Sequence, residues 1–196
     1  MTTELDALLA EVRACRHCEP HLPLGPRPVL QASATARILL VGQAPGVRVH
    51  ETGLPFNDPS GDRLRRWLDM DRDTFYDPGR LAIVPMGFCY PGKQGSGDAP
   101  PRPECAALWR RRLLEQLPEI RLTLLIGQYA QAWHLGARRK KTLTDTVKAW
   151  REYHPELFVL PHPSPRNIRW FVGNPWFEDE VVPELRAAIA KALGGS

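Results

Sequence analysis

Arg37-Ile38-Leu39-Leu40-Val41 is a short, continuous apolar run that stops at Gly42. A run of this length, bounded by glycine, is typical of a strand that is buried on both faces of a parallel sheet. Three similar runs follow, and segments with helical apolar spacing lie between them. Alternating strands and helices predict a three-layer α/β/α sandwich around a central, mainly parallel four-stranded sheet. The expected strands are 37–41, 81–84, 122–126 and 157–160, and the expected helices are 5–12, 61–68, 104–117, a segment after Gly127 through Leu135-Gly136, and 182–193.

Length and composition limit the remaining possibilities. The 196 residues suit one domain, which we take as 1–196. No apolar run approaches the roughly 20 residues that a membrane helix needs, so we expect a soluble cytoplasmic protein, and we expect it to be a monomer. The net charge of +4 permits a polyanionic partner. The 20 prolines cluster between the regular elements and predict long ordered loops, which commonly carry function.

The four cysteines form two pairs that are far apart in the sequence. Cys15 and Cys18 have C-x2-C spacing, and Cys89 and Cys105 flank a Gly- and Pro-rich segment. Such pairs can bring four thiolates around one metal centre. Thiolates select soft metals, which leaves zinc and an iron–sulfur cluster as candidates. The alternatives are four unrelated core cysteines and disulfides, which the lack of a signal peptide disfavours.

Unusual side chains follow the expected strands. In open parallel sheets, ligands bind beyond the carboxyl ends of the strands. The loops at 42–46, 53–61, 85–89 and 161–167 all begin or lie there. They carry an amide, an aromatic ring, a carboxylate and an imidazole, so we expect one cleft formed by Gln43, Phe56, Asp58, Gly87 and His162.

Several of these motifs resemble those of the uracil-DNA glycosylase superfamily. Gly42-Gln43-Ala44-Pro45-Gly46, Gly53-x-Pro55-Phe56 and His162-Pro163-Ser164 occur in the same order and on the same elements as in that superfamily. The cysteine spacing is similar to that of its iron–sulfur branches, often called families 4 and 5. The resemblance extends from the first cysteine to the last helix.

The resemblance implies a DNA glycosylase of base excision repair. Such an enzyme flips a uracil, or another deaminated or damaged base, out of the duplex and hydrolyses its N-glycosidic bond. It also implies a 4Fe–4S cluster on Cys15, Cys18, Cys89 and Cys105, with zinc as the second possibility. The implied roles are base stacking by Phe56, base contact by Gly42 and Gly87, catalysis by Asp58, His162 and Gln43, phosphate contact by Ser60 and Ser164, and insertion of Arg166 into the emptied stack.

Two positions depart from the family pattern. Gln43 replaces a glutamate that positions the attacking water in family 4, and Pro85 replaces an asparagine that reads the pyrimidine edge. Family 5 similarly lacks the acid of the first motif and uses an aspartate after Pro-Phe, which nominates Asp58 here. An Asx turn before Pro59 is the structural alternative for Asp58, and His50 and Glu51 are reserve candidates. Two other functions stay open: a member of the same fold that binds DNA without turnover, and an unrelated zinc-stabilised α/β domain.

Overall fold

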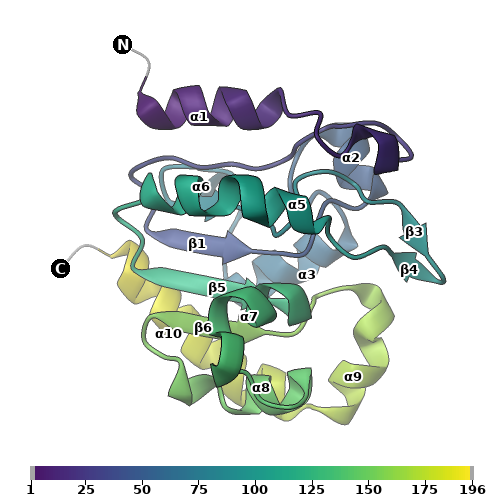
Figure 1. Ribbon diagram of the computed structural model, residues 1–196. Helices are drawn as coiled ribbons and strands as arrows, with labels where there is room; N and C mark the ends of the chain where they lie inside the picture. Colours follow the sequence, from purple (N-terminus) through teal and green to yellow (C-terminus); the bar gives the residue numbers. More distant parts are fainter. Residues whose placement is uncertain (1–2, 195–196) are drawn as a thin grey trace.

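The computed structural model describes residues 3–194, and a four-stranded parallel sheet lies at its centre (Figure 1). The strand order is β2-β1-β5-β6. Ile38 pairs with Leu81 on one side and with Leu122 on the other, which places the first apolar run in the middle of the sheet. Nearly every strand residue is buried because helices cover both faces. The strands are β1 (Ile38–Val41), β2 (Leu81–Ile83), β5 (Leu122–Ile126) and β6 (Leu157–Leu160).

Helices form a layer on each side of this sheet, as the sequence predicted (Figure 1). The two long helices α3 (Pro59–Leu68) and α10 (Val182–Leu193) contact one another on one face. The opposite face is covered by α6 (Arg111–Glu115), α7 (Gly127–Leu135) and α8 (Leu143–Lys148). The remaining helical segments are α2 (Val47–Thr52), α4 (Arg72–Phe75), α5 (Pro103–Cys105), α9 (Ile168–Gly173), η1 (Glu19–His21), η2 (Ala106–Arg110), η3 (Gly136–Arg138), η4 (Trp150–Glu152), η5 (Pro165–Asn167) and η6 (Phe177–Val181).

The N-terminal helix α1 (Glu4–Arg13) brings the first cysteine pair to the domain. The Thr3 side chain accepts a hydrogen bond from the backbone of Asp6, and the Asp6 side chain accepts one from Thr3, a capping box that fixes the start of the helix. Its apolar face is buried in the core. An ion pair of 2.8 Å between Glu11 and Arg112 joins α1 to α6. The chain leaves this anchored helix directly into Cys15.

Two features differ from the sequence-based expectation. The expected helix 104–117 is a composite of α5, α6 and an intervening π-helical segment, η2, that directly follows Cys105. The Gly-rich segment before it forms a small antiparallel hairpin, β3 (Lys93–Gln94) and β4 (Gly97–Asp98), beside the carboxyl edge of the sheet (Figure 1). Within residues 3–194, no helix is both long enough and apolar enough to cross a membrane.

Candidate active site and cysteine pocket

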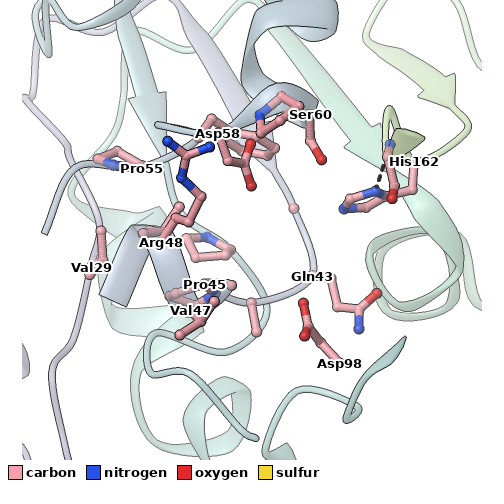
Figure 2. Close-up of a pocket in the computed structure, with 18 of the residues that line it drawn as sticks. Val29, Gln43, Pro45, Val47, Arg48, Pro55, Asp58, Ser60, Asp98 and His162 are labelled. Carbon is pink, nitrogen blue, oxygen red and sulfur yellow. Dashed lines mark hydrogen bonds between the residues drawn. The ribbon is translucent and has the colours of Figure 1, made fainter. Parts of the chain in front are cut away.

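A cleft of about 500 Å³ opens at the carboxyl edge of the sheet, where the sequence placed it. Figure 2 shows the side chains of Gln43, Asp58, Ser60 and His162 turned toward this common space. Of the residues predicted to act on the base or on DNA, all but one line the cleft: Gly42, Gln43, Phe56, Asp58, Ser60, His162, Ser164 and Arg166.

Gly87 is the exception, and its position explains how Gln43 is held. Its backbone N–H donates to the Gln43 carbonyl at 2.9 Å, and the Met86 N–H donates to the Gly42 carbonyl at 3.0 Å. These bonds continue the parallel pairing of β1 and β2 beyond the ends of both strands. The Gln43 side chain is fixed as well, because its Nε2 donates to the Ala99 carbonyl at 3.4 Å. Gly87 therefore supports the wall of the cleft and itself lines a neighbouring pocket that contains the cysteines.

Phe56 forms part of the lining in an unusual backbone conformation, with φ at +52°. Bulky residues rarely adopt positive φ, and such outliers cluster at functional sites. Two glycines make room for it. A Cβ on Gly61 would lie 1.7 Å from the Phe56 carbonyl oxygen, and a Cβ on Gly42 would lie 3.1 Å from the tip of the Phe56 ring. The backbone thus holds the half-buried Phe56 ring against Gly42, the first residue of the motif Gly42-Gln43-Ala44-Pro45-Gly46.

Asp58 both begins a helix and lines the cleft. Its Oδ1 accepts the N–H of Gly61, three residues further on, at 2.9 Å, so Asp58 has a structural role as the N-cap of α3 and not in the Asx turn considered from the sequence. The cap fixes the carboxylate at the wall of the cleft, and it leaves the second oxygen without a protein donor among the described residues. Ser60 follows in the first turn of the same helix and is buried. A carboxylate and a hydroxyl therefore enter the cleft from one helix start.

His162 enters from the loop after β6. Its Nδ1 accepts the backbone N–H of Ser164 at 3.2 Å. When Nδ1 is an acceptor, the proton of a neutral imidazole lies on Nε2, which is then a donor. Burial lowers the pKa of His162, while the carboxylates of Asp58 and Asp98 act in the opposite direction. The ring is therefore neutral at neutral pH and has one N–H to offer a ligand.

The sequence analysis missed Asp98. This residue ends β4, lines the cleft and lies close to Gly46, whose added Cβ would be 3.6 Å from Asp98 Oδ2. The hairpin also meets the opposite rim, since Arg166 Nη1 would lie 3.4 Å from a Cβ on Gly97. Its only sequence signal was a Gly-rich gap between two cysteines. The mouth of the cleft thus carries a second carboxylate together with the cations Arg48, Lys93 and Arg166.

All four cysteines line the neighbouring pocket, and all four are free thiols. The pocket wall is otherwise mainly apolar. Burial raises the pKa of Cys89 to about 11 and that of Cys105 to about 12. Thiolates there need a compensating cation, and metal binding supplies one as it displaces the protons.

The donors around the sulfurs also suit an anionic group. The backbone of Arg27 stabilises the Cys89 thiolate, the backbone of Phe88 stabilises that of Cys105, and the Arg102 side chain stabilises that of Cys18. Among residues 3–194, however, no three His, Cys, Asp or Glu side chains are grouped closely enough to hold one metal ion. The four thiols that share this pocket are the groups that would hold a metal centre there.

A buried arginine braces the wall between the two pockets. Arg110, at the end of the π-helical segment, has no exposed surface. Its Nη1 donates to the carbonyls of Val84 at 3.1 Å and Pro85 at 3.2 Å, and Pro85 lines the cleft. Its Nη2 lies 2.9 Å from Nε2 of His134, whose pKa burial lowers to about 3. Arg110 therefore ties the segment after Cys105 to the end of β2.

The fold defines an α/β protein with a cleft at the carboxyl edge of its parallel sheet, the edge at which open sheets of this kind bind ligands. The family model described as "Uracil DNA glycosylase superfamily" matches residues 30–186. The chain belongs to the uracil DNA glycosylase superfamily. The matched span contains every residue that lines the cleft except Val29, together with Cys89 and Cys105, and it starts after Cys15 and Cys18.

Proposed function

We propose that this protein is a DNA glycosylase that hydrolyses the N-glycosidic bond of a deaminated or damaged base held in the cleft. The observation that carries the proposal is the pairing of a neutral imidazole N–H with a carboxylate in one cleft of about 500 Å³. Membership of the uracil DNA glycosylase superfamily supports this reaction class.

The chemistry follows from where charge develops. As the bond from the base to C1′ breaks, the electron pair leaves with the base and positive charge grows on the sugar. The Nε2–H of His162 would donate to an oxygen of the departing base, as in an oxyanion hole. The Asp58 carboxylate would stabilise the sugar cation and orient a water, which adds its oxygen to C1′ and releases a proton. That proton balances the charge on the expelled base.

Binding requires a base outside the stack, since the bond cannot be reached within a duplex. Phe56 supplies the aromatic surface for the flipped base, and the Gln43 amide supplies polar contacts to its edge. Pro85 contributes neither an N–H nor a polar side chain to the wall. Because Pro85 cannot form the side-chain contact to a pyrimidine edge that asparagine would make, the proposed substrate class is deaminated and damaged bases in general, with uracil as one member.

The DNA backbone would contact the rim of the cleft. Ser60, Ser164 and Arg166 are the proposed phosphate and strand contacts, and Arg48 and Lys93 add positive charge beside them. Ile168 follows on α9 and is 52% exposed, which places an apolar side chain near Arg166. An exposed apolar residue beside cations could insert into the base stack and fill the space that the flipped nucleotide leaves.

We further propose that Cys15, Cys18, Cys89 and Cys105 hold a 4Fe–4S cluster with a structural role. One zinc ion needs four sulfurs about 2.3 Å from a single point, whereas a cluster takes one cysteine on each of its irons. Four thiols around one pocket, together with a cysteine spacing similar to that of the iron–sulfur branches, favour the cluster. When bound, the cluster would link α1 to the segments after β2 and would take no part in hydrolysis.

The test is excision from a panel of oligonucleotides that each contain one modified base, followed by alkaline cleavage of abasic sites. The panel includes uracil, hypoxanthine, xanthine and alkylated bases in single and double strands. We expect strand cleavage for at least one base, and its loss in His162→Ala protein. Binding without excision of any base would replace this proposal with the binding-only function, and visible absorbance with iron analysis tests the cluster separately.

A further inference from the structure

One buried N–H group beside the four cysteines has no acceptor within the part of the chain that the structure describes. Among residues 3–194, the buried side-chain polar atoms without a hydrogen-bond partner are His50 Nδ1, Trp109 Nε1 and Gln131 Oε1. Of these three residues, only Trp109 lines the cysteine pocket. Buried tryptophan N–H groups usually find a partner, because a buried donor without an acceptor loses its hydrogen bond to water and gains none in return. The Trp109 N–H group therefore needs a hydrogen-bond acceptor, and the cysteine pocket that Trp109 lines is the place where one would bind.

The local backbone conformation directs the Trp109 side chain toward the cysteine pocket. Trp109 lies four residues after Cys105, within the π-helical segment Ala106–Arg110. Such segments often occur at functional sites because they change the direction of the side chains. Here the segment turns Arg110 into the core and leaves Trp109 on the side of the cysteines, with the Arg112 guanidinium 5.3 Å from its ring centroid. The indole is partly buried, and its Nε1 atom is shielded from solvent.

The pocket offers sulfur as the acceptor. All four cysteine sulfurs line this pocket, and the rest of its wall is mainly apolar. Trp109 adds to the same wall an N–H donor that has no partner within residues 3–194. The sulfurs of a cluster held by the four cysteines would supply the acceptor.

We infer that Trp109 Nε1 donates a hydrogen bond to a sulfur of the cluster and thereby tunes its reduction potential. This inference rests on the proposed 4Fe–4S cluster. Donors to cluster sulfurs stabilise the reduced state, which carries one more negative charge, so they raise the potential. Trp109 is a tuning residue and not a catalytic one.

The first experiment compares Trp109→Phe with Trp133→Phe and the wild type, all purified anaerobically. Phenylalanine keeps an aromatic ring and removes the N–H, and Trp133 is a partly exposed indole outside the cysteine pocket. At equal iron and sulfide content, we expect a more negative midpoint potential in dithionite titrations for Trp109→Phe alone. We also expect a smaller H₂O/D₂O shift of its Fe–S stretching bands in resonance Raman spectra. An unchanged potential and unchanged shift would overturn the inference.

The wild-type protein provides a second measurement that does not depend on how a variant folds. The chain has 6 tryptophans. With ¹⁵N-labelled indoles, we expect one N–H resonance of the iron-loaded protein to carry a hyperfine shift, because the hydrogen bond transfers spin density. A full set of unshifted indole resonances in iron-loaded protein would refute the role of Trp109. Protein that takes up no iron would refute the cluster itself, so the two failures are distinguishable.

Discussion

The two tasks of Asp58 can be separated by two substitutions. Its Oδ1 caps α3 through the Gly61 N–H at 2.9 Å, and its carboxylate also lines the cleft. Asp58→Asn keeps a good capping group but removes the charge. Asp58→Ala removes both. A change in stability or excision that occurs only in Asp58→Ala therefore reports the loss of the cap. A change that occurs in both variants reports the loss of the charge.

The expected magnitudes differ for each measurement. Asparagine and aspartate are nearly equal N-caps, whereas alanine costs about 1 kcal/mol (roughly 0.5–2). The free energy of unfolding should therefore fall by about that amount in Asp58→Ala and by only a few tenths of a kcal/mol in Asp58→Asn. Excision should fall by roughly 10²-fold in both, by analogy with the loss of a preorganised group that stabilises transition-state charge.

The assay is single-turnover excision with the best substrate of the oligonucleotide panel, beside urea unfolding of each variant. Asp98→Asn is the matched control, because it removes another carboxylate from the same cleft without touching a helix cap. Wild-type excision in Asp58→Asn would show that the carboxylate is only a cap. A loss confined to Asp98→Asn would move the anionic role to the hairpin.

Three further predictions concern other groups. His162→Gln should lower single-turnover excision by roughly 10²-fold, and its affinity for undamaged DNA, measured by fluorescence anisotropy, should stay unchanged because phosphate contacts dominate that binding. Cys105→Ser should reduce the iron bound per chain, measured by elemental analysis; full iron content in that variant would remove Cys105 from the ligand set. The pKa of His134 is lowered to about 3, so the unfolded chain binds more protons below pH 6.5 and stability decreases as the pH is lowered. From pH 7 to pH 5 the wild type should lose up to about 2 kcal/mol more unfolding free energy than His134→Gln, whose amide oxygen can still accept from Arg110; parallel urea curves at both pH values would contradict this.

The sequence predicted the scaffold because the scaffold depends on simple patterns. Four apolar runs ended by glycine or proline gave all the strands of the main sheet. The rule that parallel strands share a carboxyl edge then brought Gln43, Phe56, Asp58 and His162 into one cleft. Both steps need only periodicity and topology.

Features that depend on local tertiary packing were not predictable in this way. Arg110, Arg111 and Arg112 are adjacent, and nothing in their order shows that only Arg110 is fully buried. The π-helical segment that ends at Arg110 changes which side of the helix faces the core, and this determines which of the three arginines is buried. The positive φ of Phe56 likewise depends on the absence of a Cβ at Gly61, five residues away. Asp98 lines the cleft only because residues 93–98 form a hairpin, and a Gly-rich sequence does not by itself predict a hairpin.

The cysteine pocket and the cleft are joined by the segment that follows β2. Through this segment the proposed cluster can affect the proposed reaction without taking part in it. The segment after β2 contributes Pro85 to the cleft and Cys89 to the cysteine pocket. Between them, Gly87 bonds to the Gln43 carbonyl, and Arg110 bonds to the Pro85 carbonyl from the segment that follows Cys105. A change in the sulfur ligands can therefore move the Gln43 loop through the Gly87 backbone hydrogen bond and the Arg110 side-chain hydrogen bond. For this reason a cysteine variant that loses activity does not by itself implicate the cluster in chemistry, whereas a His162 or Asp58 variant that retains its iron tests the reaction directly.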